Sequence, residues 1–338
     1  MVYNNFIPTK RKTILSYKQI ITLQQVKGFA ESTIASIGKY VQENGIDVTD
    51  TSILQDVLGE MASQKKLRGI SPSNLPDLHS AENLAEQIIE CSENEGIGII
   101  GRWDEKFPKM LRGNVKDDTG KNKPCVLLYY KGNVDVLNMP GIAIIGTREP
   151  DEDGKKAGEY FSRAFSKENF NIVSGLAIGC DTLGHRGALD SNGITTAFLA
   201  HGLDSIYPKE NEDLAKEILE KGGVLLSEYR VGTSVTRYNL IARDRLQSAL
   251  SLACLVIETG ERGGTMHAAN ATLKSGKRLY VVEYKEMYSN KKRGNVRLIE
   301  QGGVGISSTD DISEIARNVK SPIRVQAEDV QLKLDLGV

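Results

Sequence analysis

The sequence predicts an α/β protein built on a doubly wound, mostly parallel sheet that follows a small helical domain. Two observations predict this class. From Gly141 onward, short continuous apolar runs alternate with helical patterns, which is typical of parallel strands buried on both faces. Residues 13–95 instead carry helical patterns, interrupted at Gly28, Pro72 and Pro76. We therefore predict a helical domain at 1–95, an α/β domain at 96–320 and a C-terminal tail at 321–338.

The composition limits the class of protein and its partners. The 338 residues carry a formal net charge of −1, so any binding of nucleic acid must come from a local basic surface. The four cysteines are scattered without a C-x-x-C pair, and the four histidines show no metal-ligand spacing. The N-terminus lacks a secretory pattern, and no apolar run reaches the roughly 18 residues of a membrane span. We expect a reduced, cytoplasmic protein with no metal, no cofactor and no membrane contact.

The start of the helical domain has the pattern of a helix-hairpin-helix or SAM-like unit. One helical pattern stops at Gly28 and the next begins at Ser32. A tight turn between two helices can offer its amides to a DNA phosphate, although a plain helical turn would look the same. Farther along, Ser71–Asn74 is the best candidate for a loop.

The apolar runs of the second domain predict its strands in order. Two short runs, at 97–100 and 126–130, flank a polar insert at 116–123 that we expect to be an exposed loop. Six further strands are predicted at 142–145, 170–173, 195–199, 224–226, 252–257 and 278–282. Sheets of this kind bind ligands at the carboxyl ends of their strands, where the strand order reverses.

The first candidate binding loop is Gly146-Thr147-Arg148, with Lys155 in the next helix. A strand that ends in glycine before a helix presents free N–H groups to an anion, and Arg148 could hold a phosphate with two hydrogen bonds. A turn glycine beside a solvated arginine is the alternative. The nicotinamide motif G-x-G-x-x-G is absent at this loop.

The second candidate loop contains Ser174, Gly175, Ala177 and Gly179, with His185 in the helix that follows. Its glycines let the backbone approach a ligand closely, and the helix directs its N-terminus at the site. This pattern predicts a phosphate or nucleotide cradle, and a tight strand-to-helix turn is the alternative. We expect His185 to brace the loop rather than to contact the ligand.

A basic segment contains Arg237, Tyr238, Arg243 and Arg245. Arginines with an aromatic residue suit a single nucleic-acid strand, because cations hold the backbone and a ring stacks on a base. A surface loop followed by a basic helix would have the same composition.

The last candidate loop is Gly263-Gly264-Thr265, which again leads from a strand into a helix. Alone, it could be an ordinary strand-to-helix turn. Several such loops along one edge of a parallel sheet would form a composite anion site, which is a more specific signal than any single loop.

The order of these motifs resembles the DprA/Smf family of DNA-processing proteins over about residues 97–306. The matching motifs are Gly146-Thr147-Arg148, Ser174-Gly175-x-Ala177-x-Gly179-x-Asp181-x-x-x-His185-x-Gly187-Ala188-Leu189, Gly202-Leu203-Asp204-x-x-Tyr207-Pro208-x-Glu210-Asn211, Ser227-Glu228-Tyr229 and Arg243-x-Arg245. The resemblance implies a Rossmann-like domain that binds single-stranded DNA, forms a homodimer and loads a RecA-type recombinase, and is not an enzyme. It places Arg148, Ser174, Gly175, Ala177 and Gly179 at the DNA.

The sequence departs from this family at three positions of the predicted site. Leu240 stands where the family often has a base-stacking aromatic residue, so Tyr238 is the candidate substitute. Ile178 replaces a common cation. Asp244 replaces a common asparagine and weakens the field that attracts phosphate. We also expect no C-terminal winged-helix domain of the kind that many relatives carry.

Two other functions remain open. The same loops could hold a nucleotide-like small molecule, as in the lysine-decarboxylase-like phosphoribohydrolases. Those enzymes carry the motif Pro-Gly-Gly-x-Gly-Thr-x-x-Glu, whose glutamate and third glycine have no match near Arg262. The chain could also be an interaction scaffold that binds the recombinase without DNA, which the residues at 178 and 244 favour.

Overall fold

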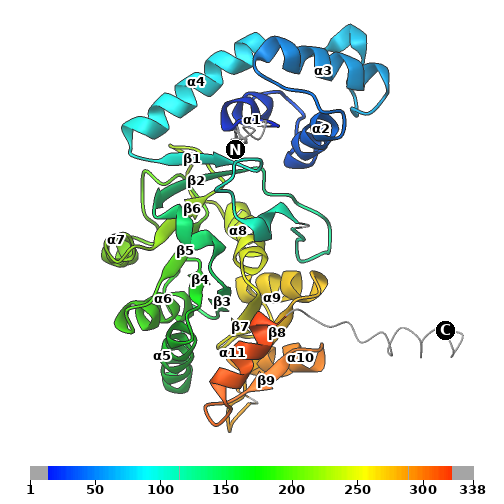
Figure 1. The fold of residues 1–338 in the computed structure, drawn as a ribbon. Coiled ribbons are helices and arrows are strands. Elements are labelled where there is room, and N and C mark those ends of the chain that lie inside the picture. The colour runs from blue at the N-terminus through cyan, green and yellow to red at the C-terminus, as the bar shows by residue number, and fades with distance from the viewer. Residues whose placement is uncertain (1–13, 114, 288, 322–338) are drawn as a thin grey trace, which may run out of the picture.

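The computed structural model describes residues 14–113, 115–287 and 289–321 of the chain. These residues form an α/β fold around a nine-stranded sheet with the order β1-β2-β6-β5-β4-β3-β7-β8-β9 (Figure 1). All neighbours from β6 to β9 are parallel, whereas β2 is antiparallel to both β1 and β6. The prediction of a mostly parallel α/β sheet is therefore confirmed. The strands are β1 (Gly98–Gly101), β2 (Leu127–Gly132), β3 (Gly141–Ile145), β4 (Asn171–Ser174), β5 (Thr195–Leu199), β6 (Val224–Ser227), β7 (Ala253–Val256), β8 (Arg278–Val282) and β9 (Val304–Ile306).

Helices cover both faces of the sheet because side chains alternate along each strand. In β3, Ile142 and Ile144 pack with α5 (Glu152–Lys167) and α11 (Ile312–Lys320). The intervening Ala143 and Ile145 pack on the opposite face with α9 (Gly264–Lys274) and α10 (Arg293–Glu300). On the first face, α6 (Cys180–Asp190) and α7 (Glu212–Glu220) continue the layer that begins with α5. On the second face, α8 (Arg237–Leu250) packs beside α9.

The strand order reverses between β3 and β7. From β3 the chain proceeds through β4 and β5 to β6, and it then returns to place β7 on the other side of β3. The loop after β3 leads to α5 on one face, and the loop after β7 leads to α9 on the other face. The two loops therefore separate at the carboxyl ends of their strands, and such a separation opens a crevice in doubly wound sheets.

Among the residues that the structure describes, four α-helices precede the sheet: α1 (Tyr17–Gln24), α2 (Glu31–Glu43), α3 (Thr51–Ser63) and α4 (Leu78–Asn94). The turn between α1 and α2 contains Gly28 with φ of +89°, a left-handed conformation that favours glycine. This arrangement of two helices and a turn is the one that the sequence predicted. Figure 1 shows the four helices beside β1 and β2.

The helices and the sheet share one buried core, in which Leu15 and Ile20 belong to the same cluster as Leu127 and Tyr129. The change from helices to strands lies between Asn94 and Gly98. Because the core continues across this point, the division into domains at 95 and 96 stays a prediction. The predicted tail at 321–338 lies outside the described residues except for Ser321.

No helix among the described residues is both long and apolar enough to cross a bilayer. The insert at 116–123 is a loop without a buried residue, as predicted, and it also makes contacts with α9 that the sequence did not predict. The Lys116 ammonium donates to the Lys274 carbonyl at 2.9 Å, and Asp118 contacts His267 at 2.6 Å.

Candidate nucleic-acid interface

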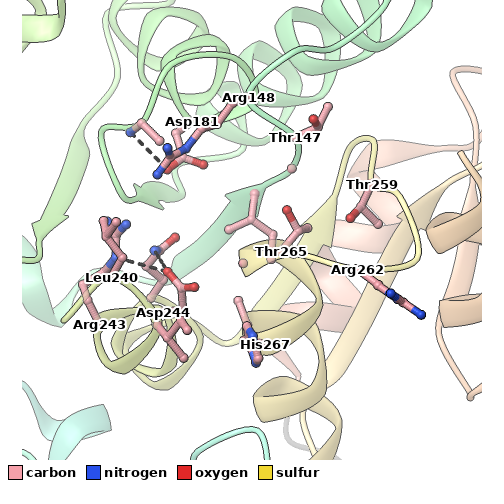
Figure 2. A pocket seen from close by; sticks show the side chains of 18 of the residues that line it. Thr147, Arg148, Asp181, Leu240, Arg243, Asp244, Thr259, Arg262, Thr265 and His267 are labelled. Carbon is pink, nitrogen blue, oxygen red and sulfur yellow. Dashed lines mark hydrogen bonds and ion pairs between the residues drawn. The ribbon is translucent and has the colours of Figure 1, made fainter. Parts of the chain in front are cut away.

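A pocket of about 720 Å³ lies at the carboxyl ends of β3 and β7, where the strand order reverses. We call it the switch pocket. Figure 2 shows Thr147 and Arg148 across the pocket from Asp244, with Thr265 at the start of α9 beside them. The pocket draws on four segments that are far apart in the sequence. Its lining residues are Ile145, Gly146, Thr147, Arg148, Ala177, Asp181, Arg237, Leu240, Ile241, Arg243, Asp244, Gln247, Thr259, Gly260, Arg262, Gly263, Gly264, Thr265, His267 and Ala268.

Two glycines allow the loops after β3 and β4 to touch. A Cβ atom on Gly146 would lie 2.4 Å from the Cys180 Sγ atom. A Cβ atom on Gly179, whose φ is +81°, would lie 2.5 Å from the carbonyl oxygens of both Thr147 and Arg148. The Cys180 amide donates to the Thr147 carbonyl at 3.0 Å. These contacts hold the backbone that carries Arg148 in a fixed position beside α6.

The loop after β4 is already occupied by a side chain of the protein itself. The amides of Gly175 and Ala177 donate to the Asp181 carboxylate at 3.1 and 3.3 Å. The Ser174 hydroxyl is buried and donates to the Ile144 carbonyl at 2.6 Å. The amides of Gly175 and Ala177 therefore stabilise the loop in this structure and do not form the open phosphate cradle that we expected there.

The N-terminus of α9 has no such internal partner. Its N-cap residue, Gly263, has φ of +133° and no capping side chain, and the first turn contains no acidic residue. Within the described part of the chain, the amides of Gly264 and Thr265 make no hydrogen bond. Free amides at the positive end of a helix dipole attract an anion. The loop at 263–265 therefore keeps these two amides available at the pocket.

Exposed arginines stand around this helix end. Arg148, Arg237 and Arg262 line the pocket, and their guanidinium groups form no ion pair with the described residues. In Figure 2 the Arg262 side chain extends away from the other labelled groups, whereas Arg148 projects from the loop after β3. The sequence predicted the neighbouring Gly263, Gly264 and Thr265 as contacts, but not Arg262.

Arg243 also lines the pocket, but its guanidinium group is used inside the protein. It is 4% exposed, and it donates to the carbonyls of Gly175 (at 2.7 Å) and Phe198. A Cβ atom on Gly175 would lie 2.0 Å from Nη1 of Arg243, so a side chain at that position would displace the guanidinium group. Arg243 thus connects the ends of β4 and β5, and it positions the pocket instead of presenting a free cation.

Asp244 places an ionisable acid in the same lining. Burial, with a smaller effect from the nearby Asp181 carboxylate, raises the pKa of Asp244 to about 7, although the guanidinium of Arg243 opposes this. Arg243 Nε and Asp244 Oδ1 are 3.2 Å apart. Near neutral pH the pocket floor therefore carries only part of the negative charge that two aspartates would give it.

The remaining predicted residues lie outside the switch pocket. Arg245 forms an ion pair with Glu228 at 2.8 Å, with the two side chains 9% and 15% exposed. His185 is buried with Nδ1 2.6 Å from the Thr195 hydroxyl, and burial lowers its pKa to about 3, so it is a neutral brace as expected. Lys155 pairs with Glu152 on the surface of α5. Tyr238 is 77% exposed and lines a neighbouring pocket.

Among the described residues, no three His, Cys, Asp or Glu side chains are grouped as metal ligands. The polar groups that line the switch pocket include backbone amides, guanidinium groups, hydroxyls, the His267 imidazole and the two buried carboxylates of Asp181 and Asp244.

A family model described as DNA recombination-mediator protein A matches residues 98–317. The chain is 29% identical to the DNA processing protein DprA of Bacillus subtilis over 229 residues, which are 68% of this chain and 74% of that protein. It is 41% identical to the protein Smf of Synechocystis over 187 residues, which are 54% of this chain and 45% of that protein. The match thus spans less than half the length of the Synechocystis relative.

Two solved structures are similar to most of this chain. The X-ray structure of DNA processing protein A from Streptococcus pneumoniae matches with a TM-score of 0.72 and 25% identity, covering 92% of this chain and 99% of that chain. The protein of the same name from Helicobacter pylori matches with a TM-score of 0.56 and 28% identity, covering 66% of this chain and 95% of that chain. That second structure was described for its mode of binding single-stranded DNA.

Proposed function

The chain belongs to the DNA recombination-mediator protein A family, and from that premise we propose that it binds single-stranded DNA at the switch pocket. The observation that carries this proposal is the combination of the free amides of α9 with the exposed guanidinium of Arg148 at one concave site. Amides at a helix N-terminus and arginines are the groups that hold phosphates in proteins.

The shape of the site favours a single strand over a duplex. The amides of α9 lie in a pocket between two loops and not on a projecting surface. A duplex presents its phosphates on a stiff convex cylinder, whereas an unpaired strand can bend into a concave site. The chain has a net charge of −1, so its attraction for any nucleic acid depends on local groups such as these.

We further propose that the protein acts in the cytoplasm as a homodimer that loads a RecA-type recombinase onto the bound strand. The support for this step is the family, whose description is that of a recombination mediator. Contacts made mainly to the phosphate backbone suit the role, because they leave most bases free for the recombinase. Strand exchange by a RecA-type protein on DNA coated with single-strand binding protein, with and without this chain, measures the loading step.

The binding step is tested by fluorescence anisotropy with single-stranded and double-stranded oligonucleotides of equal length. We expect tighter binding of the single strand at every salt concentration. Equal affinity for the two forms would contradict the assignment of the pocket to an unpaired strand.

One observation favours a second candidate, the hydrolysis of a nucleotide-like small molecule. Asp244 lines the pocket and has a pKa of about 7. A carboxyl group with a pKa in this range can act as a general acid or base near neutral pH. Release of free base from nucleoside monophosphates, lost in the Asp244→Asn variant, would establish this activity.

A further inference from the structure

A second pocket, of about 480 Å³, adjoins the switch pocket. Ile241 and His267 line both pockets, so the two form neighbouring parts of one surface. We call the second one the side pocket. A strand whose phosphates lie in the switch pocket can therefore extend a nucleotide into the side pocket without leaving the protein.

The helical N-terminal region supplies one wall of the side pocket. Three residues at the start of α2 form this wall. The insert that packs on α9 forms a second wall. The segment after β6 and the helices α8 and α9 form the rest of the side pocket. The lining residues are Ala30, Glu31, Ser32, Asp117, Asp118, Asn122, Lys123, Pro124, Glu228, Tyr229, Tyr238, Ile241, Ala242, Arg245, His267 and Ala271.

Tyr238 gives this pocket an exposed aromatic ring. It lies in the first turn of α8, is 77% exposed, and makes no ring contact or side-chain hydrogen bond with the described residues. Tyr229, Pro124 and Ile241 add further apolar surface. An exposed ring beside apolar side chains is the kind of surface on which an unpaired base stacks.

The charges of the side pocket suit a base better than a phosphate. The guanidinium of Arg245 is neutralised by Glu228 at 2.8 Å. The other ionisable side chains of the lining are three carboxylates (Glu31, Asp117 and Asp118) and two basic residues (Lys123 and His267). This excess of carboxylates repels phosphate, while carboxylate and amide oxygens accept hydrogen bonds from the amino groups of bases.

We infer that the side pocket receives one unstacked nucleobase of the strand whose backbone lies in the switch pocket, with Tyr238 as the stacking surface. The inference rests on the proposed function and extends it, because it makes the helical region part of the DNA-binding surface. Tyr238 lies two residues before Leu240, the position at which an aromatic residue is missing, in the first turn of α8.

The test compares affinities for a labelled single strand and for a strand of the same length whose central nucleotides lack bases. The two strands carry the same phosphates, so only base contacts differ. We expect the wild type to bind the intact strand about 5- to 100-fold more tightly, which is the range for stacking of a base on an aromatic side chain. Tyr238→Ala should lose this preference, and Tyr238→Phe should keep it.

Two further readouts separate stacking from a general effect of the substitution. The slope of log affinity against log salt should be the same for Tyr238→Ala and wild type, because no phosphate contact is lost. A strand with 5-iodouracil in place of one base should photocrosslink to Tyr238. Tyr160→Ala is the matched control, since Tyr160 is 41% exposed on α5 and lines neither pocket.

The outcomes distinguish this inference from the proposed function. If the wild type binds with a normal salt dependence but responds neither to base removal nor to Tyr238→Ala, the side pocket holds no base and the proposed function stands. If the wild type does not bind single strands at low salt, both are overturned.

Discussion

At the scale of single residues, the arginines near the switch pocket fall into two groups. Arg148 and Arg237 are exposed, and their charges are available to a ligand. Arg243 and Arg245 are at least nine-tenths buried and bind carbonyls or a carboxylate of the protein. The first group is suited to hold phosphate, whereas the second fixes the ends of β4 and β5 and the segment after β6 beside the pocket.

Removal of Arg245 should therefore reduce stability. Arg245→Met leaves the Glu228 carboxylate largely buried without its cation, which costs about 3 kcal/mol in comparable pairs. Urea denaturation measures this loss, and the double variant Arg245→Met/Glu228→Leu should recover part of it. An unchanged unfolding midpoint together with lost DNA binding would instead make Arg245 a DNA contact.

Asp244 should make stability depend on pH. Its pKa is about 7 in the folded protein and near the ordinary value of 3.8 in the unfolded chain. The folded state therefore holds the proton more tightly, so the stabilising contribution is complete below about pH 4 and is lost as pH rises to 7.

The Asp244→Asn variant cannot ionise, so its stability relative to wild type should rise by about 2 kcal/mol between pH 5 and pH 8. Thermal or urea unfolding of both proteins across this range gives the difference. Burial and the neighbouring Asp151 also raise the pKa of Glu258 to about 7. Because Glu258 is present in both proteins, its contribution to the pH dependence cancels in the difference. A difference that stays constant with pH would show that Asp244 is ionised throughout.

The sequence predicted which residues gather at the pocket better than it predicted their roles. Arg148 and Arg243 look alike in a linear sequence. Their roles differ because Arg243 meets the carbonyl of Gly175, 68 positions away, and that contact depends on the folded sheet. The hydrogen bonds from the Gly175 and Ala177 amides to Asp181 likewise depend on the folded geometry of the loop. Asp181 is part of the family motif, but the motif does not show that its carboxylate accepts these bonds.

At the scale of elements, the proposed binding site lies at the start of α9. A negative charge placed there should act in opposite directions on folding and on binding. In Thr265→Glu, the carboxylate lies at the second residue of α9 and should stabilise the helix by about 0.3–1 kcal/mol through the free amides and the dipole. The same charge should weaken DNA binding about 5-fold or more by repelling phosphate.

Thr265→Gln is the matched control, because it has nearly the same size without the charge. Melting temperature and anisotropy on the three proteins test both effects. Equal affinities of the Glu and Gln variants would mean that no phosphate approaches this helix end.

The strands were predictable because each buried run has a strong apolar signal. The predicted strands at 195–199 and 278–282 match β5 and β8 residue for residue. The strand β9 was missed, since three residues with an exposed Val304 give no pattern. The packing of the insert at 116–123 on α9 was also missed, because it depends on the contact of Asp118 with His267, 149 positions away.

At the scale of the whole molecule, topology brings the site together. Four segments meet at the point where the strand order reverses, and glycines at 146 and 179 let two of them touch. The total charge of −1 means that attraction for DNA depends on these few local groups. We therefore expect single substitutions at the pocket to change the ionic part of the binding free energy measurably.

The proposed site is tested by the salt dependence of single-strand affinity for wild type, Arg148→Ala and Arg317→Ala. Arg317 is an exposed arginine on α11, outside both pockets. Each phosphate contact contributes about −0.7 to the slope of log affinity against log salt. We expect Arg148→Ala to weaken binding and to make the slope shallower by about 0.7, with Arg317→Ala unchanged. If Arg148→Ala binds the single strand with the affinity and the salt slope of wild type, the placement of DNA at the switch pocket is wrong.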